Sequence, residues 1–225
     1  MHFTSDDCRA ETPQDWDRLI DALDPPALLL VIEGRMSAAL RQHSSPEDVW
    51  QEALLHAWRD RGSCEWRGLK AFRAWLLTII DNRIRDAADY LSAQKRGGKP
   101  PAVFSSLAPK GGDTGGDSAF GPEVPQSTTP SRIALHREQA EAIRSALAEL
   151  PEELRDIVRL RLIEQLPIDE IAARRQLGPS AVRHRFRKGA ELYAARLRQM
   201  LASRTAHAAA VFAAAERLDS SPRDR

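Results

Sequence analysis

Apolar residues recur along most of the chain three or four positions apart, which is the spacing of one buried face of an α-helix. After Ser45 this row consists of Val49, Trp50, Ala53, Leu54, Ala57 and Trp58. A second row runs from Leu69 to Ile84, and no stretch alternates convincingly in the manner of a β-strand. The pattern predicts an all-α protein.

Before residue 97 the spacing predicts helices near 14–23 and 27–43, a third after Ser45, and a long fourth that starts near Leu69 and ends near Gly97. The start of the third helix has the clearest sequence signal. Ser45 suits the N-cap, proline follows at the first helical position, and Asp48 lies three residues after the cap. We therefore expect a capping box at Ser45.

Residues 97–130 have no apolar period and are dense in Gly, Pro, Ser and Thr. Such a composition buries too little apolar surface to offset the entropy of ordering, so it is typical of a linker. The sequence thus predicts two small helical domains joined by a flexible linker. We place the first domain at 1–97, the linker at 98–130, the second domain at 131–202 and a helical extension with a tail at 203–225.

The second domain is predicted to contain a helix that Pro151 stops, a helix through Leu162 and a turn at 165–167. A short helix from Ile168, a turn at 177–179 and a long last helix from about Ser180 to Leu201 complete it. A short helix, a tight turn and a longer basic helix form a helix-turn-helix pattern.

Charge is distributed unevenly, although the formal net charge of the chain is only +1. Residues 1–60 contain five bases against twelve acids, a net charge of about −7, whereas residues 174–204 contain nine bases against Glu191 alone, a net charge of +8. A strongly basic helix directly after such a turn is expected of a DNA-binding protein.

Helical spacing separates the basic residues into two groups. If Val182 and Phe186 face the core, the exposed face near the helix start reaches base edges in the major groove. The predicted base-reading residues are Ser180, Arg183, His184, Arg187 and Lys188. Arg174, Arg175 and Arg185 lie off that face and are predicted to contact phosphates. The alternative is a solvated basic helix in a partner-binding bundle.

Other functional classes are not indicated by the residue types present. The chain has only two cysteines, Cys8 and Cys64, which are far apart and have no Cys or His at ligand spacing, so neither a disulfide framework nor a zinc site is supported. No histidine has a nucleophile or paired carboxylate at catalytic spacing. We predict no catalytic residue, no metal and no cofactor. The longest apolar run, 27–32, is too short for membrane insertion, so we expect a cytoplasmic protein.

Three stretches resemble the bacterial sigma factors of RNA polymerase, specifically the compact extracytoplasmic-function (ECF) type. Residues 48–59 are similar to the helix called region 2.2, residues 72–86 to regions 2.3 and 2.4, and residues 147–198 to region 4. They occur in the family's order on the two sides of the linker. The resemblance implies a protein that directs promoter-specific transcription initiation and is not itself an enzyme.

The resemblance also implies partners and roles. Core RNA polymerase would be bound at its clamp through Asp48, Gln51 and Glu52 and at its flap through the second domain. Trp66, Asn82, Arg83 and Arg85 would bind the minus-ten element of promoter DNA and assist its melting. For Trp66 the equal alternative is a ring folded back on the helices. The base-reading residues of the last helix would recognise the minus-thirty-five element. An anti-sigma factor is a possible further partner, and we expect Trp50 and Trp58 to be core residues rather than contact surface.

Two features depart from the family pattern. Gln176 stands in the helix-turn-helix where the family usually has glycine, and because a side chain at positive φ is strained, we expect a turn of different local shape. Residues 205–218 form an additional helical extension. Two alternatives remain open: a helix-turn-helix regulator that does not act as a polymerase subunit, and a sigma-like protein that only sequesters a partner.

Overall fold

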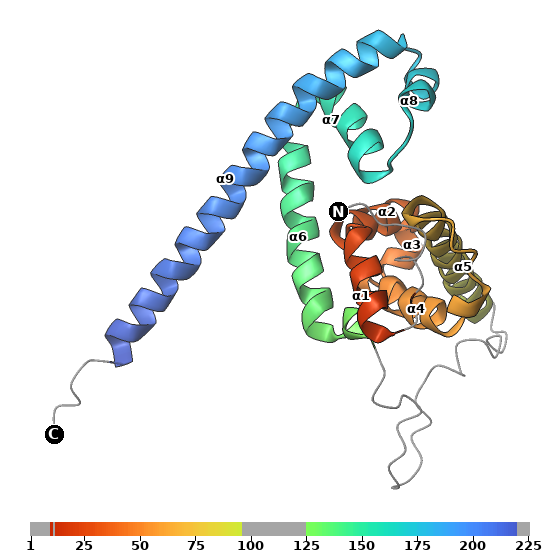
Figure 1. The fold of residues 1–225 in the computed structure, drawn as a ribbon. Coiled ribbons are helices and arrows are strands. Elements are labelled where there is room, and N and C mark those ends of the chain that lie inside the picture. Colours follow the sequence, from red (N-terminus) through yellow and green to blue (C-terminus); the bar gives the residue numbers. More distant parts are fainter. Residues whose placement is uncertain (1–9, 11, 96–124, 220–225) are drawn as a thin grey trace, which may run out of the picture. The chain divides into compact units, whose positions relative to one another are not determined.

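The computed structural model describes Ala10 and residues 12–95 and 125–219, and all regular structure in these ranges is helical (Figure 1). This confirms the predicted fold class. Cys8, residues 98–124 of the expected linker and the side chains of residues 205–218 lie outside the described part. The chain divides into two compact units, residues 1–138 and 139–225.

The first unit contains most of the helices. In chain order these are α1 (Pro13–Ala22), α2 (Pro25–Arg35), α3 (Ala38–Arg41), α4 (Pro46–Arg59), the 3-10 turn η1 (Arg61–Ser63), α5 (Leu69–Lys95), the 3-10 turn η2 (Gln126–Thr128) and the start of α6 (Pro130–Ala148). The predicted capping box is confirmed: the hydroxyl of Ser45 accepts from the N–H of Asp48, whose carboxylate accepts from the N–H of Ser45.

The helix expected over 27–43 is two helices. It begins earlier, at Pro25, because a proline in the first helical turn leaves no hydrogen bond unmade. It ends at Arg35, and Ser37 then caps α3 by accepting from the N–H of Leu40 at 3.1 Å. A local side-chain cap therefore divides a continuous apolar pattern into two helices.

Aromatic side chains fill the core of the first unit, where α4 packs against α2 and α5. The Trp16 ring meets those of Trp58 and Phe72 edge-on, with centroids 5.5 and 5.6 Å apart. Trp16, Trp50 and Phe72 are wholly buried, and Trp58 is nearly so. The prediction that Trp50 and Trp58 are core residues is confirmed.

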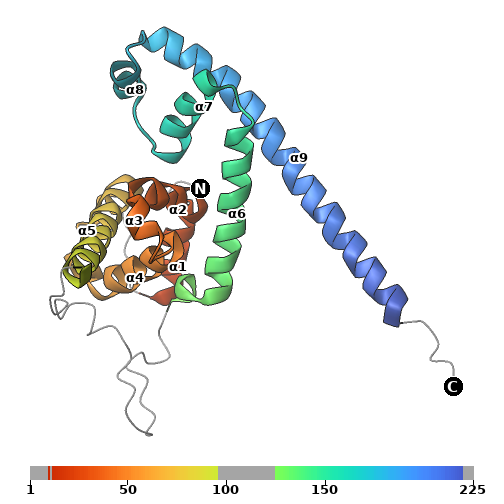
Figure 2. The ribbon, with the colours of Figure 1, turned by 180° about the vertical axis from the view of Figure 1, so that it is seen from behind.

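The final residues of the expected linker lie against α1. Both oxygens of the Asp17 carboxylate accept backbone N–H groups, from Gln126 at 2.9 Å and from Ser127 at 2.7 Å. Arg132, in the first turn of α6, pairs with Asp21. Figure 2 accordingly shows the beginning of α6 beside α1. These contacts place residues 125–132 with the first unit.

The second unit comprises the rest of α6, then α7 (Glu152–Val158), the π-helical turn η3 (Arg159–Ile163), α8 (Ile168–Arg175) and α9 (Pro179–Asp219). Helices α7 and α8 both pack against α9 (Figure 1). Their shared core consists of Ile157, Leu160, Ile171, Ala172 and Val182. The last helix does not end near Leu201 but continues as one helix to Asp219.

None of the helices in the described ranges has both the length and the apolar character needed to cross a membrane.

Candidate nucleic-acid interface

The face of α4 that carries Asp48, Gln51 and Glu52 is formed by residues three and four positions apart. Asp48 is exposed, but its carboxylate is already bound to the Ser45 N–H and hydroxyl at 2.9 and 2.7 Å. Gln51 and Glu52 are half-buried. Burial raises the pKa of Glu52, and the nearby charge of Arg83 partly offsets this. The three residues share a surface, but Asp48 also stabilises the helix start.

Arg83 connects this face to α5. Its guanidinium donates to Nε2 of His56 at 3.2 Å and pairs with Asp86 at 2.7 Å, and its side chain is only 18% exposed. Since arginine can only donate, Nε2 of His56 must accept, which requires a neutral ring protonated at Nδ1. Burial lowers the pKa of His56, and the charges of Arg83 and Arg59 lower it further.

The other predicted minus-ten residues lie on α5 and in the segment before it. Arg85 is exposed on α5 and donates to the side-chain oxygen of Asn82 at 3.0 Å. Trp66 lies in the segment before α5, half-buried, with its ring stacked on that of Phe72 at a centroid distance of 5.4 Å. These residues come from two elements of the first unit, and their role in DNA binding stays a prediction.

Stability of the first unit should decrease as the pH falls below about 6.5. Burial lowers the pKa of both His56 and His136 in the folded chain. Below about pH 6.5 the unfolded chain therefore binds more protons than the folded chain, which favours unfolding. The raised pKa values of Asp24 and Glu52 act in the opposite direction, but only nearer the carboxylate range. Urea unfolding followed by tryptophan fluorescence at pH 7.5 and 6 tests this, because all five tryptophans lie in residues 1–138.

Replacing both histidines, as His56→Gln with His136→Gln, should flatten this pH dependence. If the double variant loses as much stability as the parent chain between the two pH values, other groups are responsible.

In the second unit, the turn between α8 and α9 keeps the left-handed residue for which glycine is usual. Gln176 has φ 54° and ψ 43°, so the expectation of a different turn is wrong. The N–H of Gln176 donates to the carbonyl of Ala173 and that of Leu177 to the carbonyl of Ala172, as in a Schellman motif. Leu177 also packs on the core cluster. These contacts offset the strain.

Gln176→Gly should therefore stabilise the chain. Glycine removes roughly 1–2 kcal/mol of strain at a left-handed position. It also gives the unfolded chain more conformational entropy, which cancels part of this gain, so we expect the free energy of unfolding to rise by about 0.5–1 kcal/mol. Thermal unfolding monitored by circular dichroism measures it, with the exposed Gln165→Gly, also at positive φ, as the matched substitution. A lower midpoint for Gln176→Gly would mean that the glutamine side chain itself stabilises the turn.

The start of α9 presents the predicted base-reading residues on its surface. Ser180, Arg183, His184, Arg187 and Lys188 are all exposed, while Val182 is fully buried. In the described part of the chain, Arg183, Arg187 and Lys188 form no ion pair. Arg185 is half-buried and lines a groove with Arg175 and Leu177. Only Arg185 of the predicted phosphate-contacting residues is less exposed than this group, so the assignment of two faces stays a prediction.

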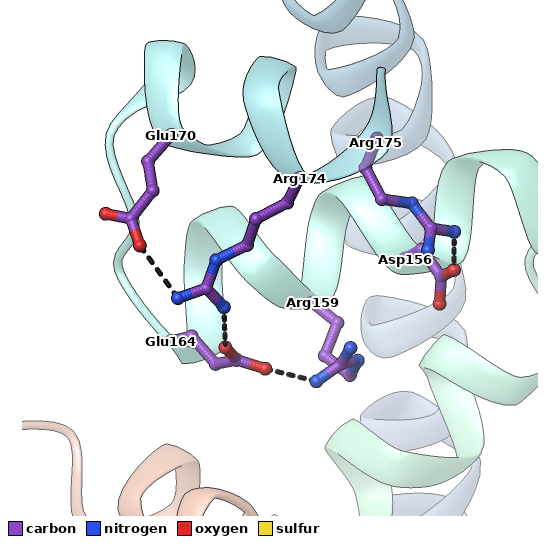
Figure 3. A network of polar contacts seen from close by, with 6 residues as sticks. All are labelled: Asp156, Arg159, Glu164, Glu170, Arg174 and Arg175. Carbon is purple, nitrogen blue, oxygen red and sulfur yellow. Dashed lines mark hydrogen bonds and ion pairs between the residues drawn. The ribbon is translucent and has the colours of Figure 1, made fainter. Parts of the chain in front are cut away.

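The predicted phosphate-contacting residues of α8 are held by carboxylates. Figure 3 shows Arg174 between Glu170 and Glu164, and Arg175 paired with Asp156. The Arg174 guanidinium lies 2.8 Å from Glu170 and 3.9 Å from Glu164. Glu164 also pairs with Arg159. Sequence reasoning missed these acids. The spacing of Glu170 and Arg174, four residues apart on one helix, is the one available signal.

Comparison with known proteins agrees with this architecture. Residues 31–96 match the model for Sigma-70 region 2, and residues 140–191 match that for Sigma-70, region 4. The chain is 31% identical over 145 residues to the ECF RNA polymerase sigma-E factor of Escherichia coli, with 64% of this chain and 69% of the relative covered. It is 32% identical over 146 residues to the RNA polymerase sigma-H factor of Pseudomonas aeruginosa, with the same coverage.

The two matched regions occur in the expected order, and the second contains a helix-turn-helix with an exposed basic face. The relatives are aligned over two thirds of their length. The chain belongs to the ECF family of RNA polymerase sigma factors, which act in transcription initiation.

Proposed function

We propose that this chain is the promoter-specificity subunit of an RNA polymerase holoenzyme and catalyses no reaction itself. The first domain, with α4 and α5, would bind the clamp of core polymerase and the minus-ten element. The second would contact the flap and read the minus-thirty-five element, and the protein would act in the cytoplasm. An anti-sigma factor is proposed as a further partner.

The observation that carries this proposal is the exposed basic face at the start of α9. Arg183, Arg187 and Lys188 present their charges to solvent directly after the helix-turn-helix turn. An arginine there can pair with O6 and N7 of guanine, while its neighbours approach phosphates. The buried Val182 holds this face outward by packing in the core of the unit.

A regulator without a polymerase role would need only the second domain. The family membership favours the sigma-factor function over this alternative.

Holoenzyme assembly tests the proposed polymerase-binding face. The double variant Gln51→Ala with Glu52→Gln should weaken binding to core polymerase by on the order of tenfold, since a few residues carry most of the affinity of an interface. Asp48 is left intact because its loss would also break the capping box. Fluorescence titration of labelled chain with core polymerase measures the Kd.

Glu47→Gln is the matched control, since it alters an acid in the first turn of the same helix. Equal affinities for the double variant and the control would place the polymerase-binding surface elsewhere.

A further inference from the structure

We infer that Asp156, Glu164 and Glu170 neutralise two arginines beside the base-reading helix and so lower the affinity of the chain for DNA phosphates. This inference rests on the proposed function, because it concerns how the second domain holds promoter DNA. The three acids would limit the attraction between this domain and DNA phosphates, which does not depend on the base sequence.

The geometry places paired and unpaired charges at different positions. Arg174 and Arg175 end α8, immediately before the turn that leads into α9. Arg174 lies between Glu170 and Glu164, and Arg175 is bound to Asp156 (Figure 3). In the described residues, by contrast, Arg183 and Arg187 at the start of α9 form no ion pair. The positive charges at the start of α9 are therefore free to meet DNA, whereas those at the end of α8 are neutralised by carboxylates.

The acids are well placed to hold these arginines. The side chains of Asp156 and Glu164 are only 27% exposed, so solvent and salt screen them less than a fully exposed pair. Asp156 projects from α7 and Glu164 follows η3, and both elements contribute to the same packed core. The carboxylate of Asp156 is thus presented from a helix, and that of Glu164 from the residue directly after η3.

Pairing changes what these arginines contribute to DNA binding. A free arginine that neutralises a phosphate releases bound counterions, which strengthens binding at low salt. An arginine already neutralised by a carboxylate must first give up that partner, and the carboxylate then repels the phosphate. Arg174 and Arg175 should therefore add little to the salt dependence, although their positions are those of phosphate contacts.

Releasing one arginine tests this directly. Holoenzyme formed with the full chain carrying Asp156→Asn should bind a duplex fragment about fivefold more tightly near 0.1 M salt, with a salt slope steeper by about 0.9, whether or not the fragment contains a promoter. The core polymerase makes the same contribution in every variant, so differences between variants report this chain. Fluorescence anisotropy over a salt series gives both quantities.

A double-mutant cycle separates masking from a general charge effect. With Arg175→Gln already present, Asp156→Asn should give a clearly smaller gain, because it then removes only the repulsion of the carboxylate and releases no arginine. Arg175→Gln alone should weaken binding slightly, because it leaves Asp156 unpaired. Glu191→Gln makes the same charge change on α9 and should leave the slope unchanged. The pair Glu164→Gln with Glu170→Gln should give at least this gain, because it releases Arg174 and also the Arg159 side chain that Glu164 holds. Circular dichroism confirms that each variant is folded.

The outcomes are distinct. An equal gain with and without Arg175, or no gain in either carboxylate variant, overturns the inference while promoter-dependent transcripts still support the proposed function. If no holoenzyme variant binds DNA and none yields a transcript, the proposed function and the inference fail together.

Discussion

Arg187→Ala is expected to weaken recognition of the minus-thirty-five element by about 1–3 kcal/mol, with the loss confined to one base position. Arg187 is exposed on the proposed base-reading face of α9, and truncation removes a side chain that can pair with a guanine. Holoenzyme binding to a set of promoters changed one base pair at a time measures this effect. The variant should no longer distinguish the bases at the contacted position.

Arg185→Ala is the matched comparison, since Arg185 is half-buried and lines the groove beside Arg175. We expect it to lower affinity evenly across the promoter set and to flatten the salt slope by about one unit. Identical profiles for the two variants would show that the two faces of α9 are assigned wrongly.

Gly189→Ala is expected to destabilise the second unit by up to roughly 2 kcal/mol. A Cβ at this position would lie 2.6 Å from Cγ2 of Val158 and 3.3 Å from Cβ of Leu154, so α7 and α9 would have to move apart. Overpacking of this kind costs about 1–3 kcal/mol, and the better helix propensity of alanine offsets about 1 kcal/mol of it. Thermal unfolding of the full chain, followed by circular dichroism, measures the change.

Gly34→Ala provides the control. Gly34 also lies in a helix, but an added Cβ there meets nothing within 4 Å, so the substitution should stabilise by up to about 1 kcal/mol. Combining Gly189→Ala with Val158→Ala should recover part of the loss, because the clashing methyl group is removed. If Gly189→Ala raised the unfolding midpoint as much as Gly34→Ala, the described contact between α7 and α9 would be wrong.

The features that the sequence predicts correctly depend on residues close together in the chain. The row from Val49 to Trp58 repeats at helical spacing, and the residues that repeat are the buried ones. The capping box joins Ser45 to Asp48 three residues away. Such features require no knowledge of which helices pack together.

Features that depend on packing between distant segments were not predictable. Arg83 meets His56 from 27 residues away, and Arg175 meets Asp156 from 19 residues away. Both arginines looked like free DNA-binding residues in the sequence, because nothing local indicates a partner. The contact of Asp17 with Ser127 joins α1 to the end of the expected linker across 110 residues.

Gln176 shows a different limitation. Its strain was correctly recognised from residue type, but the compensating contacts come from the fold. The backbone bonds of the Schellman motif and the packing of Leu177 hold the turn in its usual shape. The preference of glycine for positive φ correctly identifies Gln176 as strained. It wrongly predicts a changed turn, because tertiary contacts determine the conformation there.

Transcription in vitro tests the central claim most directly. Purified chain is added to core RNA polymerase on a library of genomic promoters, and the transcripts are sequenced. We predict a defined set of start sites that share one minus-thirty-five and one minus-ten element and that disappear when the chain is omitted. A folded chain that binds core polymerase and still yields no specific transcript would contradict the account.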